Sequence, residues 1–382
     1  MAESSPNWGG QQYRLVREAR WFRERGHKVL VVCGEGSELA AYLERNAPWI
    51  RLEKVRSWRG LRPLLRFASI VRQWQPDIIH TRSGQDSTWG CFFHFSGYAV
   101  VRSRHITIPE HVSRHDAARY RFGCRRIIAA AHVIKRDLIS RVGVTDSRID
   151  VVGEGVDLQE FHPGLNGGAF RAEVEVASDS PLFGVIAMLR CEKGQRNFIN
   201  AAARVLKSIP NARFVIVGGG QGSYADGVHA KIHQKFPMAP SPVVVTGYRE
   251  DISHVMAALD VLVVPSLCEA QTIVIPQAFA AGKPVIASRV GGIPELVRHE
   301  ERGLLVQPGD DKELAAAMLR LLGEPVLRAD VASAGFRLAR RDLSFDEKAE
   351  LVLKSYRKAL DQCLPERAFR PAISQGVVLS AR

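Results

Sequence analysis

The residues best suited to catalysis lie in two turns of the second half of the chain. The first turn, RCEKGQRNF, follows the apolar run FGVIAML and places Arg190 and Lys193 just ahead of a helical pattern that begins near Gln195. Two cations and the amino end of a helix then act on one point, and this combination attracts anions. The turn therefore predicts a site for a diphosphate.

A carboxylate stands in the second turn, CEAQT, which follows the apolar run DVLVVPS. It belongs to Glu269, and the helical pattern IVIPQAFAA comes directly after this turn. We expect outward-pointing backbone amides at Ala270, Gln271 and Thr272. A solvated lysine and a surface acid are the plain alternatives for Lys193 and Glu269, but two such turns on adjacent strands favour one shared site.

Two histidines each close a predicted strand of the first half, His80 in DIIHTR and His105 in VRSRHIT. A lone histidine is more often packed or hydrogen-bonded than catalytic, and we assign His80 to this structural class. We keep His105 as a candidate for contact with a ligand. No Gly-x-Ser-x-Gly turn, catalytic-cysteine context or metalloprotease histidine pair occurs, so the sequence does not favour hydrolysis by a side-chain nucleophile.

A glycine-rich turn, VIVGGGQGSY, resembles part of a dinucleotide-binding fingerprint. Gly218 and Gly220 fit its first two positions, but Ser223 occupies the third, and no acid follows a second strand at the expected distance. We interpret it as a tight turn near a ligand, with a purely structural turn as the alternative.

Residues that bind metals are not grouped in this sequence. The six cysteines are scattered without a CxxC pair and lack metal-ligand spacing with the histidines. No Asp-x-Asp pair is present to hold a diphosphate through a metal ion. We therefore predict no metal site and no disulfide, and we assign the diphosphate to Lys193 and Arg190.

Strand-like runs alternate with helical patterns along the whole chain, which indicates parallel, doubly wound α/β sheets. A Pro/Gly/Asn-rich stretch, FHPGLNGG, divides the pattern. We predict a first domain at 1–163, a second domain at 164–343, a terminal helix at 344–362 that crosses back to the first domain, and a loose tail at 363–382. Ligands of such domains bind in a cleft lined by the carboxyl ends of the strands.

No strand pattern precedes the glycine turn at Gly9 and Gly10, although a helical pattern, YRLVREARWFRERG, follows it. A strand, a turn and a helix are the usual opening of such a domain, so the first, central strand is predicted to be missing. Its absence would leave backbone N–H and C=O groups of the neighbouring strands without hydrogen-bond partners. A start codon assigned too late is the explanation that we favour.

The formal charge of +13 is concentrated in the first half, where residues 1–165 hold 26 Lys and Arg against 17 Asp and Glu. Its densest part, 54–74, interleaves arginines with leucines and aromatic residues. This pattern fits either contact with an anionic membrane face or an ordinary amphipathic helix with a solvated basic side. No nucleic-acid-binding motif accompanies the charge. Without a signal-like start or a membrane-spanning run, we expect a cytoplasmic protein, and peripheral attachment to the cytoplasmic membrane stays open as an alternative.

The ordered motifs together resemble the family 4 glycosyltransferases, retaining enzymes of the GT-B fold that take a sugar from a nucleotide-sugar donor. The resemblance extends from WGGQQYRLVREARWFRERGHKV through LRCEKG, FVIVGGG and CEAQTIVIPQAFAAGKPVIASRVGGIPELV to GLLVQPGD. It implies two Rossmann-like domains with a cleft between them, the first on the acceptor side and the second binding the donor.

The resemblance also implies roles for single residues. The glycine turn, Gly9 and Gly10, approaches the donor, and His105 touches the transferring sugar. Lys193 binds the diphosphate, while Arg190 takes the place of a family arginine whose position holds Met188.

In the second implied domain, Glu269 holds the donor sugar, and backbone near Gly247 and Tyr248 contacts the base. A second family glutamate, which grips the ribose hydroxyls, is replaced by Gln277. A glutamine can still accept one hydrogen bond from a ribose hydroxyl and donate another, without charge assistance.

These roles imply a hexosyltransferase that needs no metal and no cofactor other than its nucleotide-sugar co-substrate, with a UDP-sugar as the expected donor. The expected acceptor is an envelope glycan or a lipid-linked glycan such as lipopolysaccharide core. Gln277, Gln12 and Ala131 depart from the family pattern and leave a nucleotide-sugar binding protein with little turnover as the alternative. A third hypothesis, a nicotinamide oxidoreductase, is supported by the GGGQG turn alone.

Overall fold

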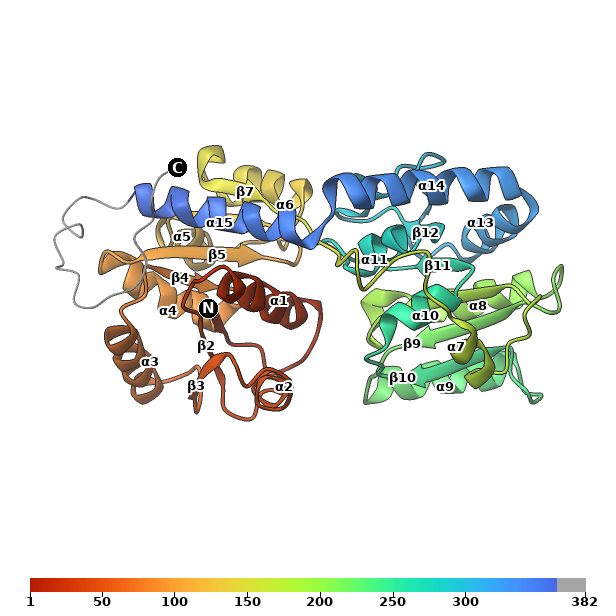
Figure 1. Cartoon of the computed structure of the whole chain (residues 1–382), viewed down its shortest axis with the longest axis horizontal. Helices are drawn as coiled ribbons and strands as arrows, with labels where there is room; N and C mark the ends of the chain where they lie inside the picture. Colours follow the sequence, from red (N-terminus) through yellow and green to blue (C-terminus); the bar gives the residue numbers. More distant parts are fainter. Residues whose placement is uncertain (363–382) are drawn as a thin grey trace. The chain divides into compact units, whose positions relative to one another are not determined.

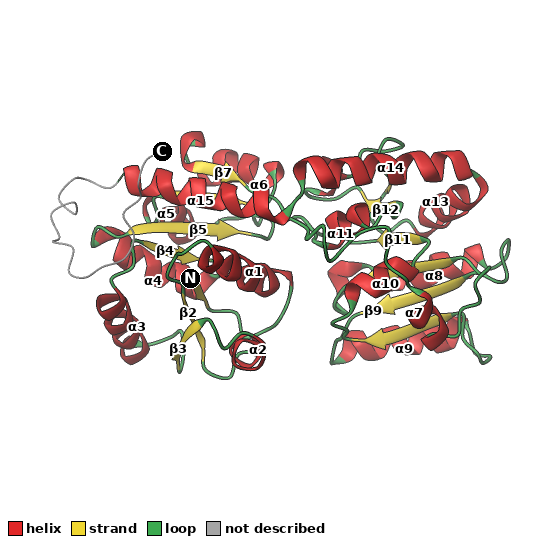
Figure 2. Cartoon of the chain, viewed as in Figure 1, coloured by secondary structure: helices red, strands yellow, loops and turns green. Residues whose placement is uncertain are grey.

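The computed structural model describes residues 1–362. It forms two compact units (Figure 1), one made of Met1–Val152 with the described residues from Ala349 onward, and the other of Gly153–Lys348. Each unit is a parallel β-sheet with helices packed against it, as Figure 2 shows. The predicted fold class, two doubly wound parallel sheets, is therefore confirmed.

The chain passes from one unit to the other at Val152 and again at Lys348. The first passage comes earlier than the predicted boundary at residue 163. The second falls inside helix α15 (Phe345–Asp361), within the segment predicted as a terminal helix. The predicted tail, 363–382, lies outside the described residues.

The sheet of the first unit has the strand order β3-β2-β1-β4-β5-β6-β7. Its strands are short and mostly apolar, because helices cover both faces of a parallel sheet of this kind. They are β1 (Ala2–Glu3), β2 (Leu30–Gly34), β3 (Arg51–Val55), β4 (Ile78–Thr81), β5 (Ala99–Arg104), β6 (Arg126–Ala129) and β7 (Ile149–Val151). The helices of this unit, besides most of α15, are α1 (Gly10–Glu24), α2 (Glu38–Asn46), α3 (Leu61–Trp74), α4 (Gly84–Phe95), α5 (Arg114–Phe122) and α6 (His132–Asp137).

The prediction that the central strand is missing was wrong. Strand β1 lies between β2 and β4, where Ala2 pairs with Val32 on one side and with Thr81 on the other. The backbone oxygen of Met1 also accepts a hydrogen bond of 2.9 Å from Val32. Two residues, one of them the acidic Glu3, are too few to produce a period-two pattern, and so the sequence did not reveal the strand.

The sheet of the second unit has the strand order β10-β9-β8-β11-β12-β13. Its strands are β8 (Leu182–Ile186), β9 (Arg213–Val217), β10 (Val243–Gly247), β11 (Val261–Val264), β12 (Val285–Ser288) and β13 (Leu304–Val306). Its helices are α7 (Gly168–Glu173), α8 (Gln195–Val205), α9 (Ser223–Lys235), α10 (Ile252–Ala258), α11 (Val274–Ala280), α12 (Ile293–Leu296), α13 (Asp311–Gly323) and α14 (Pro325–Asp342). The connections run outward in opposite directions from β8 and β11, and ligands of doubly wound folds bind beyond the carboxyl ends of such a strand pair.

Aromatic side chains pack in the core of the second unit next to the turn that carries Lys193. The rings of Phe183 and Phe214 are stacked with centroids 5.5 Å apart, and Phe198 of α8 meets Phe214 edge-on at 5.8 Å. All three side chains are buried. Strand β8 and helix α8, which lie before and after the turn that carries Lys193, thus both pack against Phe214 of β9.

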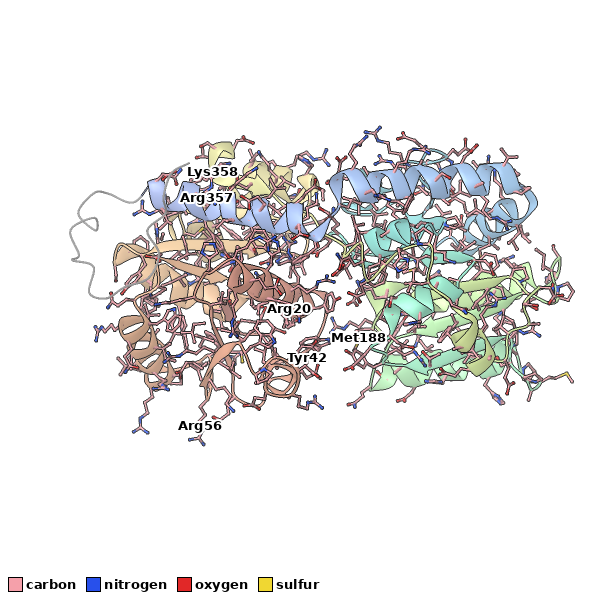
Figure 3. The ribbon with its side chains drawn as sticks, in the orientation of Figure 1. Arg20, Tyr42, Arg56, Met188, Arg357 and Lys358 are labelled. Atoms are coloured by element: carbon pink, nitrogen blue, oxygen red, sulfur yellow. The ribbon has the colours of Figure 1, made fainter. Side chains whose placement is uncertain are left out.

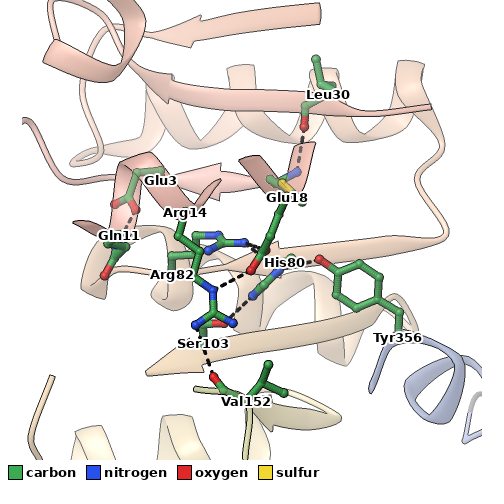
Figure 4. A network of polar contacts seen from close by, with 11 residues as sticks. Glu3, Gln11, Arg14, Glu18, Leu30, His80, Arg82, Ser103, Val152 and Tyr356 are labelled. Carbon is green, nitrogen blue, oxygen red and sulfur yellow. Dashed lines mark hydrogen bonds and ion pairs between the residues drawn. The ribbon is translucent and has the colours of Figure 1, made fainter. Parts of the chain in front are cut away.

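Helix α15 is fastened to the first unit by polar contacts. The Tyr356 hydroxyl lies 2.6 Å from Nδ1 of His80 (Figure 4), while Ser355 and Lys358 bind the two carboxylate oxygens of Asp150 at 2.9 and 2.8 Å. His80 also contacts Ser103 through Nε2 at 2.7 Å. Burial and the charge of Arg82 hold the pKa of His80 well below its ordinary value. The structural interpretation of His80 therefore agrees with the structure.

Among residues 1–362, the structure contains no helix that combines the length and the apolar character needed to cross a bilayer.

Candidate functional site

Lys193 and Glu269 meet at the point where the strand order of the second sheet reverses. Lys193 ends a 3₁₀ turn (Cys191–Lys193) after β8, and Glu269 lies in the loop after β11. The ammonium nitrogen of Lys193 is 2.5 Å from Oε2 of Glu269, and both side chains are mostly shielded from solvent. The structure thus brings together a cation and a carboxylate that lie far apart in the sequence.

The turn of Lys193 approaches β11 closely because it contains a glycine. Gly194 has a φ of +70°, and a Cβ atom added there would lie 1.9 Å from the backbone oxygen of Pro265. The amide of Leu267 donates a hydrogen bond of 2.8 Å to the backbone oxygen of Glu192, which joins the two loops directly. These contacts set the separation between Lys193 and Glu269.

A second glycine supports the loop of Glu269 from the side of β12. Gly291 has a φ of +52°, and a Cβ atom there would lie 1.5 Å from the backbone oxygen of Glu269. The next residue, Gly292, donates a hydrogen bond of 2.7 Å to the backbone oxygen of Ala270. The loop is therefore held on both sides, and its carboxylate occupies a defined position.

The predicted row of outward amides at Ala270, Gln271 and Thr272 lies ahead of helix α11, which begins only at Val274. Ala270 is buried, whereas Gln271 and Thr272 are partly exposed. The side chain of Gln271 has a separate task, since its Oε1 accepts a hydrogen bond of 2.5 Å from the amide of Glu154. That the three amides bind a ligand stays a prediction.

Gln277 lies on α11 and carries an unsatisfied acceptor. Its side chain is buried, with 5% exposed, and its Oε1 has no hydrogen-bond partner among the described residues. A buried polar atom without a partner costs about 1–3 kcal/mol. A hydroxyl group brought by a ligand could satisfy this oxygen, as the predicted contact with a ribose requires.

Arg190 is exposed, and its guanidinium makes no ion pair or hydrogen bond with the part of the chain that the structure describes. Met188, two residues earlier, is anchored through its backbone oxygen, which accepts a hydrogen bond of 2.9 Å from Gln195. Gln195 in turn accepts a hydrogen bond of 3.2 Å from Tyr224. Arg190 is thus a free cation beside a firmly held backbone.

Gln195 was not recognised in the sequence as more than a helix start. Its side chain is fully buried and connects the end of β8 with helices α8 and α9 through Met188 and Tyr224. The one available signal was an amide side chain directly after Gly194, at a position where a solvated residue would be expected. Gln195 positions the lysine turn.

The glycine-rich turn after β9 packs against the end of β8. A Cβ atom on Gly218 would lie 2.0 Å from the backbone oxygen of Ala187, and one on Gly220 would lie 2.5 Å from Cβ of Leu189. These two glycines therefore make close approaches inside the protein, which supports the structural alternative for this turn. Gly247, the last residue of β10, has a φ of +77° and open space where a Cβ would stand.

The remaining predicted residues belong to the first unit. Gly9 has an extended backbone and precedes helix α1, of which Gly10 is the first residue. His105 follows β5, and both of its ring nitrogens are shielded from solvent. All three lie beyond the carboxyl ends of strands near the point where the strand order of this sheet reverses. They share an edge of one sheet, as Lys193, Glu269 and Gly247 share an edge of the other.

A buried ion network lies beneath this edge of the first unit (Figure 4) and was not predicted. Nε of Arg14 is 2.7 Å from Oε1 of Glu18, whose other carboxylate oxygen is bound by Arg82. Burial raises the pKa of Glu18, but the charges of Arg82 and Arg14 outweigh it and lower this pKa below its usual value. The network joins α1 to the end of β4, so it helps to position the backbone around Gly9 and Gly10.

Two carboxylates lie close together at the same edge. Glu3 and Asp86 are both buried and are connected through Ser83, which donates its hydroxyl to Glu3 and its amide to Asp86. Burial and the neighbouring Glu3 raise the pKa of Asp86 to about 6. Asp86 also accepts the amide of Arg82 at 2.7 Å and so closes the start of α4. Its role is structural, since its oxygens are already occupied by the protein.

Comparison with protein-family models identifies both halves of the chain. Residues 8–160 match the model described as Glycosyltransferase Family 4, and residues 180–324 match the model described as Glycosyl transferases group 1.

Curated relatives and a solved structure agree with these matches. The chain is 29% identical to D-inositol 3-phosphate glycosyltransferase of Thermobifida fusca over 75% of this chain and 70% of that protein. It is 24% identical to UDP-Gal:alpha-D-GlcNAc-diphosphoundecaprenol alpha-1,3-galactosyltransferase of Escherichia coli, over 84% and 87%. Its fold is similar to that of Anabaena Alr3699/HepE in complex with UDP, with a TM-score of 0.83, 22% identity, and 94% and 98% of the two chains covered.

Proposed function

Since this chain is a glycosyltransferase of the GT-B fold, with a Glycosyltransferase Family 4 domain followed by a Glycosyl transferases group 1 domain, we propose that it transfers a hexose from a UDP-sugar to a lipid-linked or other envelope glycan. The observation that carries the proposal is the pair formed by Lys193 and Glu269 at the strand-order reversal of the second sheet. A glycosyl transfer needs a cation for the departing diphosphate and a polar group for the sugar, and this pair supplies both.

The proposed donor lies along the carboxyl edge of the second sheet. In this arrangement the base lies near Gly247, the ribose near Gln277, the diphosphate at Lys193 and Arg190, and the sugar at Glu269. The unsatisfied Oε1 of Gln277 and the unpaired guanidinium of Arg190 support the assignment, because each has bonding capacity that the described residues leave unused. UDP is proposed as the nucleotide because the Anabaena protein of similar fold was crystallised with it.

In the proposed reaction the bond between the sugar C1 and the diphosphate oxygen breaks, and its electron pair stays with the departing diphosphate. An acceptor hydroxyl oxygen attacks C1 from the same face and gives its proton to a diphosphate oxygen. Lys193 and Arg190 stabilise the developing negative charge. Glu269 orients the sugar hydroxyls, while the contact of His105 with the sugar, which the resemblance implies, stays a prediction. The product would keep the anomeric configuration of the donor, as the resemblance to retaining enzymes implies.

The proposed site uses protein cations in the place where many nucleotide-sugar enzymes use a metal ion. The departing diphosphate gains about one negative charge, and Lys193 and Arg190 are two cations that can stabilise it. We propose that the reaction proceeds without an added divalent metal ion.

For the acceptor, we propose a glycan on a lipid carrier or an outer envelope glycan such as lipopolysaccharide core. The E. coli relative supports a lipid-linked acceptor, since its name gives a sugar on diphosphoundecaprenol. A soluble inositol phosphate is the second candidate, because it appears in the names of several relatives, including the one from Thermobifida fusca.

The proposed function can be tested in two steps that separate turnover from binding. First, calorimetry with UDP, GDP, ADP and NAD measures which nucleotide binds. Second, mass spectrometry of mixtures with the matching sugar donors and either a lipid-linked glycan or inositol 3-phosphate identifies the product, and proton NMR assigns its anomeric configuration. Tight UDP binding without product on any acceptor would favour the alternative of a binding protein, whereas binding of NAD alone would favour an oxidoreductase.

A further inference from the structure

Helix α3 has apolar residues on two opposite sides. Phe67, Ile70 and Val71 are buried against the first unit. On the opposite side, the side chains of Leu61 and Leu65 are 69% and 59% exposed. Two large exposed leucines one helical turn apart form a continuous apolar strip, which is more than the scattered exposed leucine found on most surfaces.

Four arginines surround this strip and have no counter-ion. Arg62 and Arg72 lie on the exposed side of α3, and Arg56 and Arg59 lie in the turn before it. Within the described residues none of the four guanidinium groups makes an ion pair. The side chain of Arg56 projects away from the protein in Figure 3. By contrast, the neighbouring Lys54 and Arg66 are paired with Glu44 and Glu53 at 2.7 and 2.9 Å.

The sequence around the strip contains no acid that could neutralise it. Residues 56–76 include neither Asp nor Glu, although the chain as a whole has 40 of them. The face formed by α3 and its preceding turn therefore combines uncompensated positive charge with exposed apolar side chains.

The position of this face also suits an encounter with a surface-held substrate. Because α3 follows β3, its first turn lies beyond the carboxyl end of that strand. Gly9, Gly10 and His105 lie at the same edge of the same sheet. A surface in contact with Leu61 and Leu65 would thus lie on the side of the sheet that carries Gly9, Gly10 and His105.

We infer that the α3 face, defined as Arg56, Arg59, Leu61, Arg62, Leu65 and Arg72, docks this protein on the surface of an anionic lipid bilayer. The leucines enter the interface between headgroups and acyl chains, and the arginines bind lipid phosphates. A bilayer fits better than a nucleic acid, because phosphate-binding alone would give no role to the exposed leucines. The α3 face would have this role whether or not the proposed acceptor is lipid-linked.

The test is sedimentation of the full chain with vesicles of phosphatidylcholine alone and of phosphatidylcholine mixed with phosphatidylglycerol, at low and high salt. We expect binding to the anionic vesicles, weakened by salt, and little binding to the neutral ones. The double variants Leu61→Glu/Leu65→Glu and Arg59→Glu/Arg62→Glu should each bind at least tenfold more weakly. Both pairs are exposed, so the melting temperature should stay unchanged.

Val326→Glu serves as the matched control. Val326 is 73% exposed on α14 of the other unit, so the change places the same charge on an equally exposed apolar position outside the α3 face. It should bind vesicles as the unmodified chain does. Equal binding to neutral vesicles, undiminished binding of both double variants, or a loss in Val326→Glu as large as theirs would each overturn the inference. A single-stranded oligonucleotide that competes the chain off the vesicles and binds the leucine variant normally would assign the arginines to nucleic acid instead.

Discussion

The ammonium nitrogen of Lys193 and a carboxylate oxygen of Glu269 are 2.5 Å apart, although 76 positions separate the two residues in the sequence. Each is the ionic partner of the other. A diphosphate at Lys193 and sugar hydroxyls at Glu269 would both draw on this pair, so donor binding and the geometry of the pair are coupled.

Replacement of Lys193 by alanine should lower kcat by about 10²–10³-fold, because it removes a cation aimed at charge that develops during the reaction. Lys193→Arg keeps the charge and should retain more activity. Steady-state rates with the donor that binds best provide the measurement. Arg190→Ala should lower kcat by a smaller factor, about tenfold, because Arg190 is exposed and its charge is screened by solvent. A Lys193→Ala enzyme that keeps half of its turnover would remove the diphosphate role from this residue.

Two substitutions at Gln277 should separate donor affinity from stability. Gln277→Leu removes a buried acceptor that has no partner among the described residues, so the protein should melt at the same temperature or higher. UDP should bind about fivefold more weakly, which corresponds to the loss of roughly 1 kcal/mol. Gln277→Glu restores a charged acceptor and should bind UDP at least as well as the unmodified chain. Calorimetry and thermal melting are the measurements. A clear loss of affinity in Gln277→Glu contradicts the ribose assignment.

Gly194→Ala should disturb the site through the backbone. The substitution meets both a φ of +70° and a contact at 1.9 Å with Pro265, so we expect a loss of about 2–4 kcal/mol in the free energy of unfolding, together with weaker UDP binding. Gly222→Ala is the control, since Gly222 has a φ of +79° but nothing within 4 Å of the new Cβ. It should cost about 1–2 kcal/mol and leave UDP binding intact. Equal effects of the two changes would show that the close approach to β11 is not critical.

The buried His80 should make the free energy of unfolding depend on pH. Its pKa is lowered in the folded protein, so the unfolded chain takes up a proton below about pH 6.5 that the folded chain cannot. Stability from this source is therefore complete above that pH and falls by about 1.4 kcal/mol per pH unit below it. Asp86 acts in the opposite sense, because its raised pKa makes the folded form gain stability as the pH falls through about 6.

The contribution of His80 can be isolated by comparing the pH dependence of unfolding of the unmodified chain with that of His80→Gln. Urea unfolding from pH 7.5 to 5 should show that His80→Gln loses less stability with acid than the unmodified chain, even though it is less stable at neutral pH. Parallel curves for the two proteins would mean that His80 is protonated in the folded state as easily as in the unfolded state.

Chelation should not abolish transfer. If Lys193 and Arg190 carry the charge of the leaving diphosphate, treatment with EDTA should leave at least half of the activity, and added Mg²⁺ or Mn²⁺ should change it less than twofold. A rate that vanishes with EDTA and returns with one metal ion would assign the leaving-group charge to that ion.

The sequence by itself was enough for the overall architecture. Apolar runs of strand length between helical patterns leave parallel α/β sheets as the one way to bury both faces of each strand, and the structure has two such sheets. It also placed Lys193 and Glu269 after neighbouring strands, because both turns combine charge with a helix start. Local spacing carries this information, since each turn is only a few residues long.

Other features were decided only by the tertiary structure. The two-residue β1 exists because β2 and β4 offer it hydrogen bonds, and no local pattern marks it. Gln271 and Gln195 acquire their roles from partners far along the chain, Glu154 and Tyr224. The Arg14–Glu18–Arg82 network likewise joins helix α1 to the end of β4, which lie far apart in the sequence. Burial and long-range pairing depend on which elements pack together, and a single sequence read locally does not contain that information.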